Sequence, residues 1–469
     1  MLVTGGRVSG RAVIPALLDL GASVTVADSS NDELALCAEL GAQTSSMDEA
    51  ERDVAAGVFA LVVTSPGFRP DAPVLVAATT VGIEVWGDIE FSWRVDRAEI
   101  YGPARTWLVI TGTNGKTTTT SMVESILRAS GVPSAACGNI GVPVLDALRR
   151  TDPAPRVLAV ELSSVQLFWA PSVRPDAGVV LNIAEDHLDW HGSMGAYVDA
   201  KSRALTGQVA VVGLDDPIAR TLLGDAAAPT KIGYTAGEPA VGQLGVRDGS
   251  LVDVATGDPE ILIAADEIEP AGPAGLQDAL AAAALTRSIG TSAAAVADGL
   301  RAFRVGPHRA ALVREIGGVR FVDDSKATNP HAARSSILAH DRVIWLAGGL
   351  LKGAVVDDMV AEVRSRLAAA VVFGRDGAEI AAALARHAPD VPVVRIPPGD
   401  DSSVAHVTDG DEVMKMVVQA AASRAVPGTT VLLAPSTASF DQFRDYGHRG
   451  DSFAAAASAL STSDLGLLS

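Results

Sequence analysis

The sequence predicts an α/β protein of several domains, each built on a largely parallel sheet. Short apolar runs of strand length alternate with longer segments of helical composition, as βαβ units do. Polar or glycine-rich turns directly follow several of these runs, which is typical of the carboxyl edge of a doubly wound sheet. The 469 residues, 48% of them hydrophobic, suffice for about three cores. We place the domains at residues 1–97, 98–305 and 306–469.

Composition excludes several classes of protein. The net charge of -19 disfavours general binding to nucleic acid or to an anionic membrane. Two cysteines, Cys37 and Cys137, are too few for a disulfide framework or a zinc site and fit a reducing compartment. No basic leader and no run of about twenty apolar residues is present. We expect a cytoplasmic protein that neither enters a membrane nor binds nucleic acid.

The first domain begins as a Rossmann-like unit. A strand over Leu2–Thr4 runs into a glycine turn at Gly5 to Gly10, a helical stretch follows, and a second strand ends at Asp28. The turn amides can bind a diphosphate and Asp28 can contact a ribose or a base, although a nicotinamide site and a purely structural turn are alternatives. Only three strand residues precede the turn, fewer than the usual five or six, so we expect the natural start to lie upstream. Another strand, Leu61–Thr64, ends at a turn containing Gly67.

The second domain opens with a nucleotide-binding pattern, WLVITGTNGKTTTT from Trp107. An apolar strand precedes Gly112 and Gly115, and the segment after them can form a helix whose N-terminus favours phosphate. Lys116 would reach the terminal phosphates and Thr117 would offer its hydroxyl to magnesium. Ile110 stands where the general G-x-x-x-x-G-K-S/T pattern has its first glycine. The alternative interpretation of this stretch is a structural strand-to-helix turn.

Three polar clusters follow in the same domain. Asn139 lies within the loop GNIG, and Glu161 follows the strand Val157–Val160, where a carboxylate suits a second magnesium ligand. A glutamate at a serine-capped helix start is the alternative. The third cluster, NIAEDHLDWH, contains His187 and precedes a helical segment with Lys201.

Lysine is rare in this chain, so each lysine is a stronger candidate than usual for a specific chemical role. Only six of the 37 basic residues are lysines. Where lysine persists, chemistry that arginine cannot supply is favoured, such as a compact charge or a reactive amine. Lys201 is therefore a candidate functional residue rather than an ordinary surface lysine.

The rest of the chain contains the end of the second domain and the whole of the third. Residues 207–273 alternate short apolar runs with glycine and proline turns, which predicts a small β-rich annex, and Asp278 to Ser288 reads as an alanine-rich helix. The third domain begins at a Gly-Pro hinge and again alternates strands with helices. Loops after three of its strands carry Lys326, Lys352 and Ser439, which can converge on an anionic substrate.

Together these motifs resemble the Mur ligase family over nearly the whole chain. The residues that carry the resemblance are GTNGKTTTT from Gly112, GNIG from Gly138, ELSS from Glu161, NIAEDHLDWH from Asn182, Lys201, His308-Arg309, DDSKATN from Asp323 and APSTASFDQF from Ala434. The last two motifs resemble the D-glutamate-adding member in particular. The resemblance implies a Rossmann-like N-terminal domain, a P-loop-type central ATPase domain and a Rossmann-like C-terminal domain.

The resemblance also implies ATP and two magnesium ions. Thr117 and Glu161 would ligate one ion and His187 the second. Lys201 matches a lysine that reacts with carbon dioxide, and the resulting carbamate is an anion able to orient magnesium. His308 would lie at the hinge near the nucleotide. The implied ATP-binding residues are Gly112, Thr113, Asn114, Gly115, Lys116, Thr117, Thr118, Arg309 and Asp324.

The implied substrates are UDP-N-acetylmuramoyl-L-alanine and D-glutamate, bound by a monomer. For the precursor the matching residues are Val8, Ser9, Asp28, Gly67, Asn139 and Ser163, which replaces the nicotinamide interpretation of the first domain. For D-glutamate they are Lys326, Thr328, Lys352, Ser439 and Phe440. The chain departs from the family at Gly275 and Asp278, where relatives place asparagines against adenine.

The implied reaction is ATP-dependent amide-bond formation through an acyl phosphate, in peptidoglycan precursor synthesis. The catalytic residues would be Lys116, Lys201, His187 and Glu161. Alternatives are another Mur-type ligase, a folylpolyglutamate synthase, a P-loop ATPase that acts as a switch, and a nicotinamide oxidoreductase.

Overall fold

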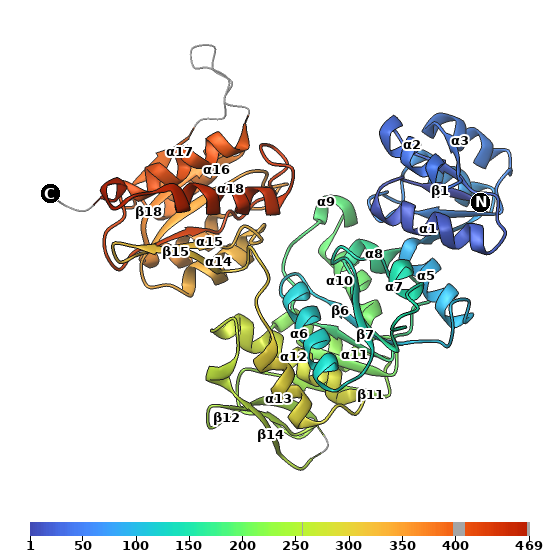
Figure 1. Ribbon diagram of the computed structural model, residues 1–469, viewed down its shortest axis with the longest axis horizontal. Helices are drawn as coiled ribbons and strands as arrows, with labels where there is room; N and C mark the ends of the chain where they lie inside the picture. The colour runs from blue at the N-terminus through green and yellow to red at the C-terminus, as the bar shows by residue number, and fades with distance from the viewer. Residues whose placement is uncertain (256, 397–408, 467–469) are drawn as a thin grey trace. The chain divides into compact units, whose positions relative to one another are not determined.

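The computed structural model describes residues 1–255, 257–396 and 409–466, which form three sheets connected by helices (Figure 1). The described chain divides into two compact units, residues 1–183 with 190–303, and residues 184–189 with 304–469. We describe each unit by itself. The α/β class with several parallel sheets is as predicted.

The first sheet has the strand order β3-β2-β1-β4-β5, and all of its pairings are parallel. Its central strand, β1, is buried and pairs with a neighbour on each side over its whole length. The strands are β1 (Leu2–Thr4), β2 (Thr25–Ala27), β3 (Gln43–Ser45), β4 (Leu61–Thr64) and β5 (Glu84–Gly87). The helices between and after them are α1 (Val8–Asp19), α2 (Asn31–Glu39), α3 (Met47–Ala55), α4 (Pro73–Thr80) and α5 (Asp88–Arg97).

The second sheet, also in the first unit, has nine strands in the order β14-β13-β12-β11-β10-β9-β6-β8-β7. Parallel pairing runs from β7 to β12, and β13 and β14 add antiparallel strands at one edge. The strands are β6 (Thr106–Thr111), β7 (Ser134–Gly138), β8 (Val157–Glu161), β9 (Ala177–Val180), β10 (Val209–Gly213), β11 (Thr230–Tyr234), β12 (Gln243–Arg247), β13 (Ser250–Asp253) and β14 (Glu260–Ala264). The β-rich composition of residues 207–273 was predicted correctly. Its separation as an annex was wrong, because β10 pairs with β9 and continues the central sheet.

Helices cover the central sheet. The helix after β6, α6 (Lys116–Ala129), packs against α12 (Pro273–Ser288) and α13 (Ala293–Ala302). The alanine-rich helix α12 begins at Pro273 rather than at the expected Asp278, because proline suits the first helical turn. The other helices are α7 (Val144–Leu148), α8 (Ser164–Phe168), α9 (Leu188–His191), α10 (Met194–Ser202), η1 (Arg203–Leu205), α11 (Pro217–Asp225) and η2 (Ala265–Glu267).

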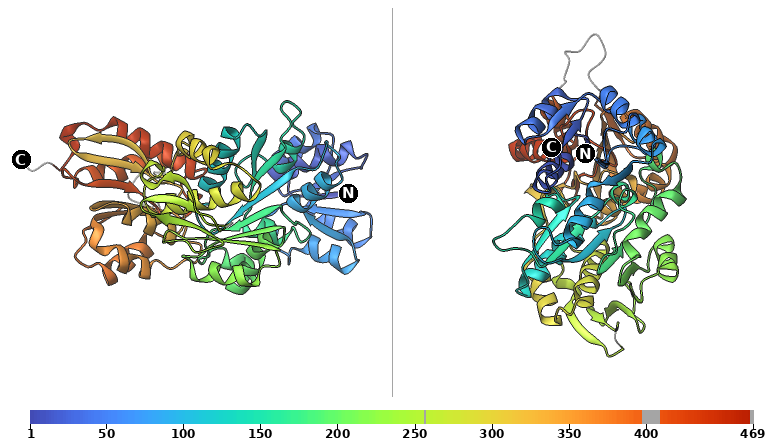
Figure 2. Two further views of the ribbon diagram at one scale, coloured as in Figure 1. Left: turned by 90° about the horizontal axis from the view of Figure 1, so that it is seen from below. Right: turned by 90° about the vertical axis from the view of Figure 1, so that its right-hand side faces the viewer.

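The third sheet belongs to the second unit and has the order β15-β16-β20-β17-β18-β19. Only the hairpin of β15 and β16 is antiparallel among its described pairings. Apolar clusters fill both faces of the sheet, and Figure 2 shows helices on both sides of it. The strands are β15 (Ala311–Ile316), β16 (Val319–Asp323), β17 (Val343–Gly348), β18 (Leu367–Phe373), β19 (Val393–Arg395) and β20 (Thr430–Leu433). The helices are α14 (Pro330–Leu338), α15 (Asp357–Val363), η3 (Arg364–Arg366), α16 (Gly377–His387), α17 (Gly410–Ala422), α18 (Tyr446–Ala459) and η4 (Thr462–Asp464).

Within the part of the chain that the structure describes, none of these helices combines the length and the apolar character needed to cross a bilayer.

Candidate active site

The predicted phosphate loop is a tight turn between a buried strand and a helix. Strand β6 ends at Thr111 and α6 begins at Lys116, so the loop occupies Gly112 to Gly115. Gly115 has φ of +86°, and a Cβ there would lie 2.2 Å from Asp278 Oδ1. Glycine is required at this position both for its conformation and for the close approach of α12. The loop therefore leads directly into the N-terminus of α6, and the unpaired amides of a helix N-terminus favour anions.

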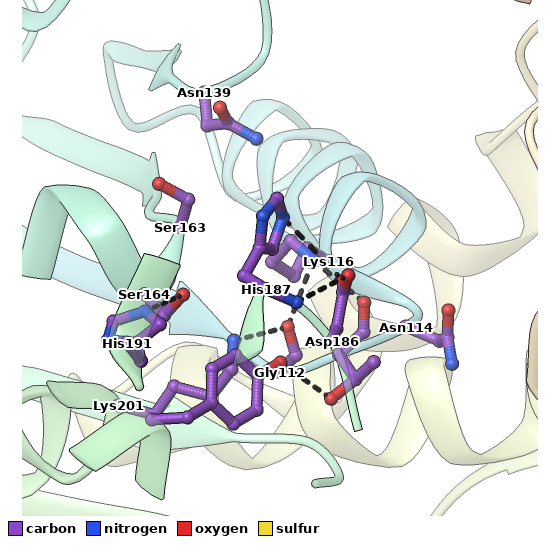
Figure 3. Close-up of polar contacts among 12 residues, drawn as sticks. Gly112, Asn114, Lys116, Asn139, Ser163, Ser164, Asp186, His187, His191 and Lys201 are labelled. Carbon is purple, nitrogen blue, oxygen red and sulfur yellow. Dashed lines mark hydrogen bonds and ion pairs between the residues drawn. The ribbon is translucent and has the colours of Figure 1, made fainter. Parts of the chain in front are cut away.

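Two lysines meet at one carbonyl oxygen of this loop. Lys116 Nζ donates to Gly112 O at 2.9 Å and to Thr113 O at 2.9 Å. Lys201 Nζ donates to the same Gly112 O at 2.7 Å and to Thr111 Oγ1 at 3.3 Å (Figure 3). Lys201 comes from α10, is only 2% exposed and also lies over the ring of Tyr197. The sequence-based candidates Lys116 and Lys201 are therefore neighbours.

Asn182 holds the turn in shape, a contribution that the sequence analysis did not assign. Its backbone oxygen accepts from Thr113 N at 3.0 Å, and its side chain exchanges hydrogen bonds with Asn114 N at 2.9 Å and Asn114 O at 3.1 Å. Tyr197 adds a bond between its hydroxyl and Thr113 Oγ1 at 2.9 Å. The position of Asn182 could have indicated this role, because it is the first polar residue after β9 and begins the motif NIAEDHLDWH.

Glu161 is the last residue of β8 and is only 1% exposed. Its Oε1 accepts from Asn139 Nδ2 at 3.0 Å, and Asn139 N donates to Glu161 O at 2.8 Å. Its Oε2 is buried and has no hydrogen-bond partner among the described residues. A buried, half-satisfied carboxylate is suited to a cation.

These donors fit magnesium that is shared with a nucleotide. Among residues 1–255, 257–396 and 409–466, no group of three or more His, Cys, Asp or Glu side chains can hold a metal ion. Magnesium usually keeps several waters and takes one or two carboxylates together with substrate phosphates, so one such carboxylate is compatible with it. Thr117, on the first turn of α6, is half-buried, and Thr118 beside it is buried.

The serines after Glu161 serve the local fold. Ser163 caps α8 and forms a capping box with Gln166. Ser164 Oγ lies 2.9 Å from His191 Nε2 (Figure 3). The substrate contact expected of Ser163 stays a prediction.

His187 lies in the segment 184–189, which groups with the second unit, so we describe it separately. Its φ is +52°, uncommon for a residue other than glycine. Its ring Nε2 lies 3.7 Å from Asp186 Oδ2, and its backbone N donates to Asp186 Oδ1 at 3.0 Å (Figure 3).

Four of the expected precursor-binding residues lie at the carboxyl edge of the first sheet. Val8 begins α1 and is 55% exposed, and Ser9 follows it. Asp28, after β2, accepts from Gly6 N at 2.7 Å and from Ser30 N at 2.9 Å, which fixes the glycine turn. Gly67 lies in the loop after β4.

A buried carboxyl group, Asp88, lies at the start of α5. Burial raises its pKa to about 6, while the side chains of Ser9 and Gln166 act in the opposite direction. Its Oδ1 has no hydrogen-bond partner in the described part of the chain. The sequence around Asp88 predicts no role for it, because a single Asp at a helix start has no distinctive pattern.

In the second unit, three loops at the carboxyl edge of the third sheet carry the expected amino-acid-binding residues. Leu350 and Ala438 exchange backbone hydrogen bonds of 2.8 and 3.0 Å, which joins the loop of Lys352 to that of Ser439. Lys352 has φ of +51°, and its Nζ lies 5.6 Å from the ring centroid of Phe440.

The third of these loops follows β16. Lys326 Nζ lies 3.8 Å from the ring centroid of Tyr446, a residue that the sequence analysis did not single out. Thr328 N donates to Lys326 O at 2.8 Å. Ser439 is buried and Phe440 is 66% exposed.

The residues expected near the nucleotide in this unit surround β16. His308, with φ of +62°, places Nδ1 2.7 Å from Asp323 Oδ2. Burial raises the pKa of Asp324 to about 6, and the adjacent Arg309 acts in the opposite direction. Asp324 Oδ1 accepts from Ala310 N at 3.2 Å.

Comparison with known proteins gives a consistent result. Residues 110–285 match the family described as "Mur ligase middle domain", and residues 308–437 match "Mur ligase, glutamate ligase domain". A protein of Rhodococcus jostii (strain RHA1), named UDP-N-acetylmuramoylalanine--D-glutamate ligase, is 63% identical over 480 residues, covering 99% of this chain and 96% of the relative. A protein of Mycobacterium leprae with the same name is 53% identical, covering 98% of this chain and 97% of the relative.

Solved structures share the fold at lower identity. The UDP-N-acetylmuramate-alanine ligase of Thermotoga maritima gives a TM-score of 0.59 at 17% identity, over 98% of this chain and 99% of that one. A MurF ligase of the same organism, solved in complex with ADP, gives 0.55 at 15% identity, over 92% and 94% of the two chains. From the two family matches and the relatives that span nearly its whole length, the chain belongs to the Mur ligase family.

Proposed function

We propose that this protein is an ATP-dependent ligase that joins the amine of D-glutamate to the alanyl carboxylate of UDP-N-acetylmuramoyl-L-alanine. The observation that carries the proposal is the meeting of Lys116 and buried Lys201 at the carbonyl of Gly112, on a loop at the start of a helix. The printed names of relatives that span nearly the whole chain support the choice of substrates.

The chemistry requires activation of an acid, because amide formation in water is uphill. A phosphoryl group passes from ATP to the alanyl carboxylate and forms an acyl phosphate. The amine of D-glutamate then attacks the acyl carbon and phosphate leaves. Charge develops on phosphoryl oxygens and then on an oxyanion, so preorganised cations and amides are the main need. Lys116 and the first amides of α6 are suited to hold these phosphates.

Mur ligases as a family use ATP and magnesium. When bound, magnesium neutralises charge on the phosphates and orients them. Thr117 and Glu161 are the residues that we propose to hold it, with His187 holding a second ion. We further propose that the neutral amine of Lys201 adds carbon dioxide, forming an N–C bond and releasing one proton. Its product is an anion suited to orient magnesium.

The other substrate contacts that we propose come from loops at the carboxyl edges of the three sheets. Val8, Ser9, Asp28 and Gly67 would hold the uridine diphosphate end of the precursor, and Asn139 and Ser163 would lie nearer its carboxylate. Arg309 and Asp324 would contact the nucleotide. The D-glutamate contacts would come from Lys326, Thr328, Lys352, Ser439 and Phe440. We propose three functional domains, 1–97, 98–305 and 306–469, acting as a monomer in the cytoplasm.

The decisive experiment measures phosphate release from ATP with the alanyl precursor alone, with D-glutamate alone and with both. Release only with both substrates is the expected result. A panel of other amino acids distinguishes the related activities, since a different preferred amine would indicate another ligase of this type. ATP turnover indifferent to any amino acid would instead indicate a switch or partner-binding ATPase.

A further inference from the structure

Arg449, on the first turns of α18, is fully buried in the second unit. No carboxylate of the described residues lies within ion-pair distance of its guanidinium, although Asp441 and Asp323 are close enough to act on it electrostatically. Burial lowers the pKa of Arg449 to about 9. Burying a cation without a directly paired anion costs free energy, so its hydrogen bonds must offset that cost.

The hydrogen bonds of Arg449 connect three separate loops. Nε and Nη2 donate to Ser325, at 3.0 Å to Oγ and 2.9 Å to the backbone oxygen. Nη1 donates to Gly348 O at 3.3 Å, and Nη1 and Nη2 both donate to Thr437 O at 3.1 Å. Gly348 is the last residue of β17, and Ser325 and Thr437 lie in the loops that follow β16 and β20, at the same edge of the third sheet.

Each acceptor is close in sequence to a residue expected to bind the amino acid. Ser325 precedes Lys326, Gly348 lies four positions before Lys352, and Thr437 lies two positions before Ser439. Backbone hydrogen bonds join the loops only in pairs: Ser436 N donates to Ala327 O at 3.0 Å, Gly348 N donates to Pro435 O at 3.1 Å, and Leu350 exchanges two bonds with Ala438. The guanidinium of Arg449 adds to these pairwise bonds one rigid group that contacts all three loops at once.

The first turns of α18 pack closely against neighbouring segments of the second unit. A Cβ at Gly450 would lie 2.1 Å from His308 Nδ1, so the backbone of α18 lies directly against His308. Ser325 Oγ also donates to Tyr446 O at 2.7 Å. The first turns of α18 thus hold the loop of Lys326 at two points.

We propose that Arg449 is a positioning residue that fixes the three loops relative to one another, so that Lys326, Lys352 and Ser439 can contact one amino-acid substrate. This role rests on the proposed function, because it assumes that those residues bind the amine substrate. Lysine cannot replace it, since an ammonium has no planar fork with which to reach three acceptors.

The test compares Arg449→Lys and Arg449→Met with Phe453→Leu, a matched control one turn further along α18. Phe453 is equally buried, but its side chain packs in the apolar cluster and donates no hydrogen bond, so its variant should destabilise α18 while Arg449 keeps its hydrogen bonds to the loops. Steady-state phosphate release gives KM for D-glutamate, for ATP and for the alanyl precursor, and thermal unfolding gives Tm for each variant.

For both Arg449 variants, KM for D-glutamate should rise about ten- to a hundredfold, since small displacements of positioning groups have effects of this size. KM for ATP and for the precursor should stay within about twofold of wild type. Guanidinium ion added to a third variant, Arg449→Ala, should restore part of the D-glutamate affinity, and the same addition should not affect Phe453→Leu.

Two results would overturn the proposal: an unchanged KM for D-glutamate in the Arg449 variants, or equal changes of all three KM values matching those of Phe453→Leu at similar Tm. Failure of the proposed function is visible separately, in the wild-type protein, as phosphate release that does not depend on D-glutamate. If another amino acid supports wild-type turnover, KM for that amino acid is measured in the same variants. A selective rise supports the role of Arg449, and an unchanged value contradicts it.

Discussion

At the scale of single residues, Lys201 is the side chain whose chemistry can be tested most directly. It is one of six lysines and is buried against the phosphate loop. We expect Lys201→Ala to lose about a hundred- to thousandfold in ligation rate, the typical cost of removing a preorganised charged group. Lys231→Ala is the control, because Lys231 is exposed and donates only to Gly224 O in the described structure.

The carbamate adds a second outcome for the same variant. A small carboxylate such as acetate or formate can take the place of the anion, so part of the activity of Lys201→Ala should return as its concentration rises. Full activity of Lys201→Ala without any added acid would contradict the proposed modification. Wild-type rates should be insensitive to the same acids.

Asp88 gives a prediction about stability and pH. Its pKa is raised from 3.8 to about 6, so between these values the folded chain retains a proton that the unfolded chain has released. Stability therefore falls as pH rises through this range, and the loss is complete above about pH 6. Asp88→Asn removes this loss. At pH 8 the variant should be more stable than wild type by about 1–3 kcal/mol, and at pH 4 the two should be nearly equal.

Thermal unfolding across pH 4 to pH 8 measures this difference. Glu39→Gln, at an exposed position of the same region, should follow the wild-type curve. A constant offset between Asp88→Asn and wild type at every pH would show that packing, not ionisation, causes the difference.

At the scale of elements, the two ends of α6 provide a matched pair of glycines. Gly115 has φ of +86° and Gly131 has φ of +72°, so alanine is strained at both. A Cβ at Gly115 would meet Asp278 Oδ1 at 2.2 Å, whereas a Cβ at Gly131 would have no atom within 4 Å. We expect Gly115→Ala to weaken ATP binding at least about tenfold through displacement of the loop. Gly131→Ala should cost only about 1 kcal/mol of stability.

Equilibrium binding of a fluorescent ATP analogue separates these effects. Equal losses of affinity in both variants would mean that strain in α6, rather than contact with α12, determines the shape of the loop. Reduced Tm with normal affinity is the expected result for Gly131→Ala.

The same elements show what local sequence could predict. Strands β1 and β4 were predicted with their observed ends, because each is a buried apolar run followed by a turn that contains glycine. The annex was misjudged because the pairing of β10 with β9 joins residues distant in sequence. Arg449 was missed for the same reason, since its partners Ser325 and Gly348 lie 124 and 101 residues away. Motifs reveal residues that act near one another in sequence, whereas a side chain that links loops becomes visible only in the fold.

At the scale of the whole molecule, the two compact units have separate apolar cores. In the first unit Leu127, on α6, is fully buried. In the second unit Phe321, on β16, lies in the cluster between the third sheet and helices α17 and α18. Because the apolar clusters around the first and the third sheet each consist of residues of one unit, we expect the two units to unfold in two distinguishable transitions.

Differential scanning calorimetry of the intact chain tests this expectation. Leu127→Ala should lower one transition and Phe321→Ala the other, each because a core substitution of this kind costs about 2–5 kcal/mol. ATP with magnesium should raise the transition that is sensitive to Leu127, since a ligand stabilises the unit to which it binds. D-glutamate should raise the transition sensitive to Phe321. A single transition shifted by both variants and by both ligands would mean that the two units unfold cooperatively, so that their separate cores do not give them separate stabilities.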